Sequence, residues 1–272
     1  MEIYQGVALG VLQGLTEFLP VSSSGHLVLG QHLFGIMEPA LSFDISLHVG
    51  TLAAVFLVFF REILAMIRAL ARFAGAGSGA GAMLREDMDL KLVLLILVGS
   101  VPTAVLGLVI KKYAMGAFAS VGLVGVMLLL TGTFLWFTRR LPGGGVGVPG
   151  LSYSKAVWIG VVQGVAVLPG ISRSGSTISA ALLLGVDRET AGRFSFLLSL
   201  PAILGAEALS LRESMGTGLD LDPATLYGTL AAFVVGYFAL IVLLRIVRQG
   251  RLYLFAPYCW TVGLIALGAG LI

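Results

Sequence analysis

The residues best suited to chemistry lie in two short polar motifs of an otherwise apolar chain. The first motif places the carboxylate of Glu17 shortly before three consecutive hydroxyl groups and the imidazole of His26. The second places the guanidinium of Arg173 among further hydroxyl groups. Ionisable groups are costly in a lipid environment unless they are paired or hydrated. Their presence in two such motifs therefore indicates a functional site.

Arg173 indicates that the ligand of this site is an anion. A guanidinium stays charged and presents several N–H donors to an oxyanion. Neighbouring hydroxyls, together with a glycine-loosened backbone at the start of a helix, would form a cradle for phosphate. The residues expected to bind it are Ser22, Ser24, Gly25, Ser172, Ser174, Gly175 and Thr177. The alternative is a structural arginine that sets topology or pairs with Glu17.

Two pairs of polar residues are spaced by one helical turn. Gln13 and Glu17 form the first pair, and their oxygens suit a hard divalent cation such as Mg²⁺ or Ca²⁺, or proton transfer by Glu17. The structural alternative is a polar clamp between helices. Asp44 and His48 repeat the spacing and are second-tier candidates, the alternative being a pair at a helix entry. Glu207 is interpreted as an interfacial acid.

The second motif repeats the first one. Gln13 and Gly25 of the first motif recur as Gln163 and Gly175 of the second, at the same separation along the chain. The two copies carry different ionisable residues, because the first has a carboxylate and an imidazole and the second a guanidinium. A duplicated element with complementary polar groups favours one site built from two halves.

Composition indicates a polytopic membrane protein. Of 272 residues, 58% are hydrophobic and only 11% are charged, and the mean hydropathy is +1.01. Soluble domains average about 25% charged residues. The net charge of +3 gives no reason to expect nucleic acid, because basic residues of membrane proteins mostly set orientation. A single cysteine, Cys259, excludes an intrachain disulfide.

The helices that position the motifs can be predicted from apolar length. Crossing the hydrocarbon takes about 20 helical residues, so 3–12 and 26–35 are too short to span. They flank the first motif as a re-entrant hairpin, and 156–185 forms a second hairpin around the other motif. Such hairpins are tolerated where they are buried in protein or line a wet cavity. The expected full spans are 43–60, 91–110, 119–138, 194–211, 225–245 and 252–272.

The predicted fold class is an all-α polytopic membrane protein with an inverted-topology repeat. Half one, 1–140, and half two, 153–272, are joined by the linker 141–152, and each holds one re-entrant helical hairpin and three transmembrane helices. Because three is odd, the halves lie in opposite orientations. We expect the Arg-rich loop 61–91 to be cytoplasmic, so that the first hairpin enters from outside. A polar loop, 187–190, precedes the fourth span.

The two motifs resemble those of the undecaprenyl-diphosphate phosphatase family, bacterial envelope enzymes of the bacitracin-resistance type. The first family motif, Glu/Gln-x-x-x-Glu leading to Pro-Val-Ser-Ser-x-Gly-His, is matched from Gln13 to His26. The second, Pro-Gly-x-Ser-Arg-Ser-x-x-Thr, is matched from Pro169 to Thr177. The resemblance implies hydrolysis of undecaprenyl diphosphate to undecaprenyl phosphate and inorganic phosphate, which recycles the lipid carrier of peptidoglycan synthesis.

The resemblance also implies a set of site residues and surroundings. Glu17, Ser23, His26 and Arg173 match the catalytic core of the family. A divalent cation is implied, as is an active site open to the outer, periplasmic face of the bacterial plasma membrane. The implied partners are a polyprenyl diphosphate substrate and membrane lipids, and a homodimer is left open.

Two positions depart from the family pattern. Gln13 stands at the first acidic position, which lowers the expected affinity for a cation if both side chains are ligands. Near the C-terminus, Tyr258 is followed by Cys259 where the family pattern has an arginine. If that arginine holds phosphate in relatives, another group must do so in this chain.

The sequence leaves two questions of mechanism and class open. Ser23 attacking the terminal phosphorus, with His26 handling the proton and Glu17 orienting His26 or a metal, is one hypothesis. Attack by water activated by Glu17 or His26 is the other. A transporter or flippase for a phosphorylated polyprenyl lipid would share the inverted repeat and the phosphate site. The pairing of Ser23 with His26 favours the enzyme, because a carrier needs no nucleophile.

Overall fold

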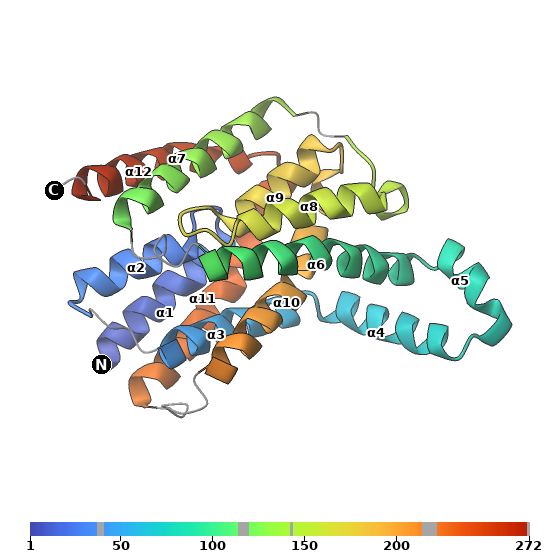
Figure 1. Ribbon diagram of the computed structural model, residues 1–272, viewed down its shortest axis with the longest axis horizontal. Helices are drawn as coiled ribbons and strands as arrows, with labels where there is room; N and C mark the ends of the chain where they lie inside the picture. Colours follow the sequence, from blue (N-terminus) through green and yellow to red (C-terminus); the bar gives the residue numbers. More distant parts are fainter. Residues whose placement is uncertain (37–40, 114–119, 142–143, 214–221, 271–272) are drawn as a thin grey trace.

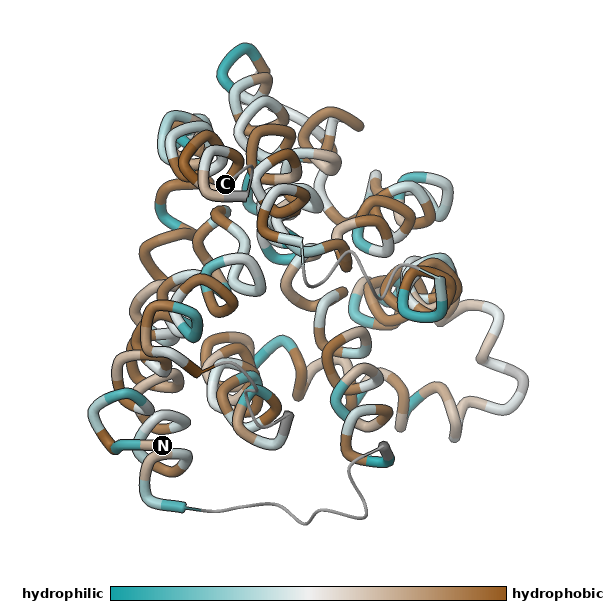
Figure 2. Tube along the Cα trace, turned by 60° about the vertical axis from the view of Figure 1, so that its left-hand side comes forward, coloured by the Kyte–Doolittle hydropathy of each residue, from teal (hydrophilic) through white to brown (hydrophobic). Residues whose placement is uncertain are grey.

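The computed structural model describes residues 1–36, 41–113, 120–141, 144–213 and 222–270. Regular structure in these residues is helical apart from one isolated β-bridge between Val146 and Val186. Most helices in Figure 1 lie roughly along the long axis of the molecule, and apolar residues predominate along them in Figure 2. The prediction of an all-α fold is confirmed for the described residues.

Two interrupted helical hairpins carry the two motifs. The first consists of α1 (Ile3–Phe18) and α2 (Ser23–Leu33), and the second of α8 (Tyr153–Val165) and α9 (Arg173–Leu183). The predicted hairpins are therefore present, but α1 extends beyond its predicted end at residue 12. Gly14 does not break α1, because it faces α11, where an added Cβ would lie 2.8 Å from the carbonyl oxygen of Ala232.

Among the described residues, five stretches are long and apolar enough to cross a membrane, and one bent pair of helices would make a sixth span. The long helices are α6 (Met88–Tyr113), α7 (Val121–Phe137), α10 (Arg188–Glu213), α11 (Pro223–Arg248) and α12 (Ala256–Gly270). Short 3₁₀ helices lie at Gly77–Gly79, Thr138–Arg140, Val148–Gly150 and Leu252–Phe255. Residues 119, 142, 143, 271 and 272 of the predicted segments lie outside the described residues.

The bent pair corrects the predicted loop at 61–91. Helix α3 (Leu41–Val58) turns by 77° into α4 (Phe60–Ala74), and α5 (Ala80–Glu86) follows. In Figure 1, α4 and α5 project from the rest of the bundle. The predicted loop is wrong because apolar and basic residues alternate in α4 with a helical period, which forms an amphipathic helix. Only the glycine-rich stretch after Ala74 interrupts it.

The predicted polar loop at 187–190 is also wrong. Helix α10 already begins at Arg188, and the Asp187 carboxylate accepts a hydrogen bond from the backbone N–H of Thr190 at 2.9 Å. A carboxylate just before a helix satisfies an N–H that has no partner within the helix. These polar residues therefore start the helix instead of separating it from the hairpin.

Glycine pairs hold both hairpins against long helices. Gly10 of α1 faces Gly228 of α11 so closely that an added Cβ would lie 2.1 Å from the Gly228 oxygen. Gly160 of α8 faces Gly99 of α6 in the same way, at 2.0 Å. Small residues permit such backbone contact between membrane helices. The two hairpins are thereby fixed by equivalent contacts.

Candidate active site

The breaks of the two hairpins meet inside the bundle. Ser22 accepts a hydrogen bond from the backbone N–H of Gly170 at 3.1 Å, and Ser174 donates to the carbonyl of Phe18 at 2.8 Å. Gly170 adopts a φ of +92° and lies against α7, where an added Cβ would come 2.5 Å from the oxygen of Val124. Only glycine fits there, so the second hairpin can approach the first.

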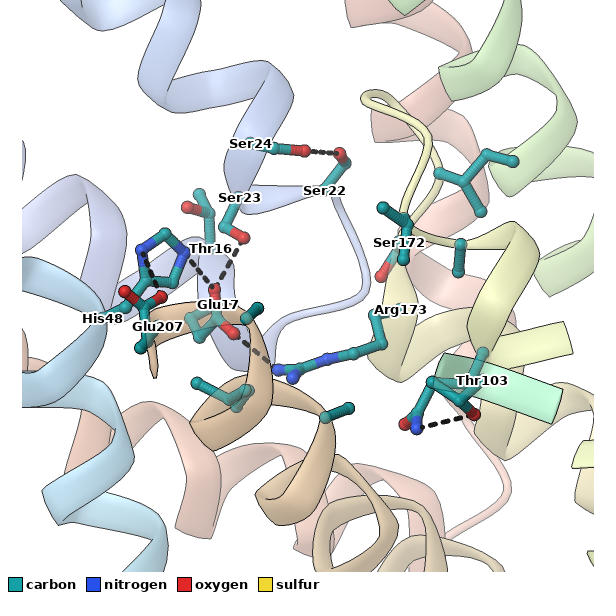
Figure 3. A pocket seen from close by; sticks show the side chains of 17 residues that line it. Thr16, Glu17, Ser22, Ser23, Ser24, His48, Thr103, Ser172, Arg173 and Glu207 are labelled. Atoms are coloured by element: carbon teal, nitrogen blue, oxygen red, sulfur yellow. Dashed lines mark hydrogen bonds and ion pairs between the residues drawn. The ribbon is translucent and has the colours of Figure 1, made fainter. Parts of the chain in front are cut away.

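A polar pocket of about 770 Å³, including its open mouth, lies between these breaks (Figure 3). Its walls come from both hairpins and from α3, α6 and α10. Seven predicted site residues line it, namely Glu17, Ser22, Ser23, Ser24, His48, Ser172 and Arg173. The remaining polar lining consists of Thr16, Thr103, Gln163 and Glu207. The expectation of one pocket with residues from both motifs agrees with this arrangement.

The Glu17 carboxylate is the centre of the hydrogen-bond network in this pocket. Its Oε1 accepts a 2.5 Å bond from Nη2 of Arg173. Its Oε2 accepts a 2.7 Å bond from the hydroxyl of Ser23 and a 3.0 Å bond from the amide of Gln13. The ion pair considered from the sequence is therefore present, but it lies in the pocket wall, where Figure 3 shows Arg173 reaching toward Glu17. Charged side chains in such a place can serve an anionic ligand.

His26 lies apart from the residues that line the pocket. Its Nδ1 donates to the Ser22 carbonyl at 2.8 Å, because a carbonyl oxygen can only accept. In the neutral ring, Nε2 then accepts from the hydroxyl of Tyr258 at 2.7 Å. The two rings are also stacked, with centroids 5.7 Å apart. A proton-transfer role for His26 stays a prediction, and Tyr258 is its immediate partner.

His48 brings a third ionisable group to the pocket. Its Nδ1 donates to the Asp44 carbonyl at 2.9 Å, which leaves Nε2 facing Glu17, 3.9 Å from Oε2. Glu207 lies on the other side of the ring, with Oε1 3.8 Å from Nδ1. The Asp44 carboxylate is directed elsewhere and accepts a 2.7 Å bond from the Gln31 amide.

Glu207 is the pocket residue that sequence reasoning set aside. The sequence predicts an interfacial acid at this position, because Glu207 lies near one end of a predicted span. The available signal was general, since an acid inside an apolar helix usually marks a functional site. The structure places it in the pocket wall, with Oε2 buried and without a hydrogen-bond partner among the described residues.

Other predicted phosphate-binding residues make contacts within the second hairpin or with α7. The N–H of Gly175 donates to the hydroxyl of Ser172 at 3.1 Å, which caps α9. Thr177 donates to the Arg173 carbonyl at 2.9 Å, and Gly25 packs against Val124. Gly25, Gly175 and Thr177 do not line the pocket, and their contact with phosphate stays a prediction.

The predicted cation ligands do not form a complete metal site on their own. No group of three or more His, Cys, Asp or Glu in the described part of the chain could hold a metal ion. Gln13 donates to Glu17 and does not line the pocket, although its Oε1 is buried without a partner. Any cation in this pocket would need further oxygen ligands from a bound molecule.

The fold and the site together define a multi-pass membrane protein with a pocket lined by charged and hydroxyl side chains between two interrupted hairpins. Residues 6–265 match the model of the family described as bacitracin resistance protein BacA. The chain therefore belongs to the BacA family.

Individual relatives cover the full length of the chain. It is 61% identical to undecaprenyl-diphosphatase from Desulforapulum autotrophicum over the whole of each chain. The same identity and coverage hold for undecaprenyl-diphosphatase from Desulfosudis oleivorans. The enzyme of that name from Halothermothrix orenii is 42% identical over 98% of each chain.

Proposed function

We infer that this protein is an undecaprenyl-diphosphatase, which hydrolyses undecaprenyl diphosphate to undecaprenyl phosphate and inorganic phosphate. Full-length similarity to enzymes of that name supports the inference. The observation that carries it in the structure is the convergence of Ser23, Glu17 and Arg173 on one pocket. This set offers a nucleophile, a proton acceptor and a fixed positive charge, which phosphoryl transfer needs.

The geometry supports a covalent route through Ser23. The Ser23 oxygen attacks the terminal phosphorus, the bond from that phosphorus to the bridging oxygen breaks, and undecaprenyl phosphate leaves. Glu17 accepts the hydroxyl proton, since it already accepts the Ser23 hydrogen bond at 2.7 Å. Water then hydrolyses the phosphoserine and releases inorganic phosphate. In this route Arg173 turns from Glu17 to the phosphate oxygens and neutralises their charge.

His26 has a different place in this proposal. Its Nε2 lone pair is engaged by Tyr258, so it can take a proton only when that hydrogen bond opens. We therefore assign the proton of Ser23 to Glu17. The imidazole, hydrogen-bonded to the Ser22 carbonyl, orients the serine loop.

A divalent cation, Mg²⁺ or Ca²⁺, is proposed to enter with the substrate. The diphosphate would supply oxygen ligands, and the pocket carboxylates of Glu17 and Glu207 would supply others. The bound cation would neutralise charge on the diphosphate. A chelator should then lower the rate of phosphate release. Glu207→Gln should raise the half-saturating Mg²⁺ concentration, measured by calorimetry in the presence of an unreactive diphosphate analogue. Unchanged cation affinity in the Glu207→Gln variant would exclude Glu207 as a ligand of the cation.

The proposed orientation places the pocket toward the outer face of the bacterial plasma membrane. Basic residues gather at the opposite end of the bundle, where Arg188 begins α10 and Arg248 ends α11. Glu207 is 19 residues after Arg188 (207 − 188), or ~28 Å along α10. The positive-inside rule puts the arginine end in the cytoplasm.

The inverted repeat of halves 1–140 and 153–272 is also a proposal. Its support is the equivalence of the two glycine contacts, in which each hairpin packs on a long helix of the other half. Labelling of single cysteines from one side of intact cells would test it. A cysteine in place of Gly81 and one in place of Gly268 should react with a membrane-impermeant thiol reagent from opposite sides of the membrane.

The assay for the proposed function is phosphate release from a long-chain polyprenyl diphosphate by purified protein in detergent. Mass spectrometry should identify the polyprenyl monophosphate as the second product. Arg173→Ala should abolish release, whereas the matched exposed variant Arg85→Ala should retain it. Folded wild-type protein that releases no phosphate, but moves labelled lipid across proteoliposome membranes, would identify a transporter instead.

A further inference from the structure

A second cavity lies at the opposite end of α10 from the catalytic pocket. It has a volume of about 330 Å³, including its open mouth, and lies beside Phe59, where α3 bends into α4. Arg193 lines this cavity and Glu207 lines the catalytic pocket. The two residues are 14 positions apart on α10 (207 − 193), which corresponds to ~21 Å along the helix axis. The cavity is therefore separate from the site described above.

Positive charge exceeds negative charge around this cavity. Three arginines line it, Arg188, Arg193 and Arg248, against two carboxylates, Glu62 and Glu189. In the part of the chain that the structure describes, one ion pair joins these groups, from Arg248 to Glu189 at 3.5 Å, and both of its side chains are exposed. An exposed pair contributes little binding energy. Two guanidinium groups thus keep their capacity for another anion.

Arg193 and Arg188 both lack hydrogen-bond partners for their side chains among the described residues. The Nε of Arg193 is buried without an acceptor. A buried donor without an acceptor is unfavourable, so an acceptor from outside the chain would be stabilising. Arg188 lies directly over Gly250, whose φ is +70°. An added Cβ on Gly250 would come 2.3 Å from Cζ of Arg188, so the bare backbone is what admits this guanidinium.

The surroundings of the cavity indicate a membrane surface. Helix α4 begins next to Phe59, and its exposed apolar side chains, Ile67 and Leu70, alternate with exposed basic ones. An amphipathic helix of this kind lies in the interfacial plane, with basic residues near anionic head groups. We propose that the cavity binds the phosphate of an anionic lipid head group, on the membrane face opposite to the catalytic pocket.

Thermal unfolding of the full-length protein in neutral detergent tests this proposal. Phosphatidylglycerol should raise the midpoint by roughly 2–4 °C, because a ligand that binds only the folded state stabilises it. Phosphatidylcholine with the same acyl chains should not. Arg193→Gln should lose at least half of the shift, while Arg85→Gln, a matched exposed arginine on α5, should keep it. Phosphate release by Arg193→Gln at the wild-type rate would show that this variant is folded.

A further arm separates the lipid from a free ion. Inorganic phosphate at the same concentration should give a smaller shift than phosphatidylglycerol. A contrary result is that inorganic phosphate raises the wild-type midpoint as much as phosphatidylglycerol does, with no such rise in Arg193→Gln. That result would support an anion site at Arg193 but would contradict a lipid as its ligand. Equal responses to both lipids, or equal shifts in Arg193→Gln and Arg85→Gln, would overturn the site altogether.

Discussion

Arg173 of the second hairpin donates to the Glu17 carboxylate of the first hairpin at 2.5 Å, so the two polar motifs are joined by one ion pair. The Glu17 side chain is only 6% exposed, whereas the Arg173 side chain is 19% exposed and faces the pocket. The arginine can therefore exchange its partner for a substrate phosphate without leaving its place.

The first prediction concerns the coupling of these two residues. Glu17→Gln and Arg173→Gln should each lower kcat/KM by roughly 10²- to 10⁴-fold, because one removes the proton acceptor and the other the anion-binding charge. The kcat/KM of the double variant should be at most about tenfold below that of the less active single variant, since the two groups act as one unit. Independent, multiplicative losses would show that they serve separate sites.

The second prediction concerns the partner of His26. Tyr258→Phe removes the hydroxyl that bonds to Nε2, while the ring contact with His26 can remain. We expect kcat to fall by roughly fivefold to tenfold, the equivalent of one lost hydrogen bond. Tyr227→Phe, on an exposed tyrosine of α11, is the control. An unchanged kcat in Tyr258→Phe would mean that this hydrogen bond does not position the imidazole.

The third prediction concerns His48, which stands between two carboxylates of the pocket. His48→Gln should lower kcat/KM by roughly tenfold, because a His48 ring with both protons places a positive charge between the carboxylates of Glu17 and Glu207, and the variant loses it. His32→Gln is the matched control, because His32 is an exposed histidine at the end of α2. The measurement is kcat/KM of both variants from steady-state kinetics of phosphate release. Equal activities in the two variants would assign His48 to packing alone.

The fourth prediction concerns the glycine contacts that hold the hairpins. Gly10→Ala should lower Tm by roughly 2–10 °C, because overpacking costs about 1–3 kcal/mol and the facing atoms belong to backbone. Gly160→Ala should behave alike. Gly268→Ala in α12, where an added Cβ meets nothing within 4 Å, should leave Tm unchanged. A Tm of Gly10→Ala equal to that of Gly268→Ala would refute the close approach of α1 and α11.

Much of the site was predictable because its residues are local in sequence. The repeat of Gln13 and Gly25 as Gln163 and Gly175 indicated two equivalent hairpins, and both are present. A carboxylate in one copy and an arginine in the other indicated a shared anion site. The pairing of Arg173 with Glu17 is, from the sequence alone, only the structural alternative to anion binding by this arginine.

The remaining features depend on contacts that no local pattern encodes. Glu207 and His48 meet because α3 and α10 both border the pocket, and nothing in either helix specifies the other. The hydrogen bond of His26 to Tyr258 depends on a rotamer and on a residue more than 200 positions away. The arginines of α4 indicate both an orientation and a helical period, and the helix is predicted only from the period.

The most direct test of the account is a single-turnover reaction with a polyprenyl diphosphate labelled in its terminal phosphate, stopped with acid. We predict label bound to the wild-type protein at Ser23, and neither bound label nor hydrolysis in Ser23→Ala. Ser154→Ala, on an exposed serine of α8, should behave like the wild type. Near-normal hydrolysis by Ser23→Ala would contradict the covalent route and assign the attack to water.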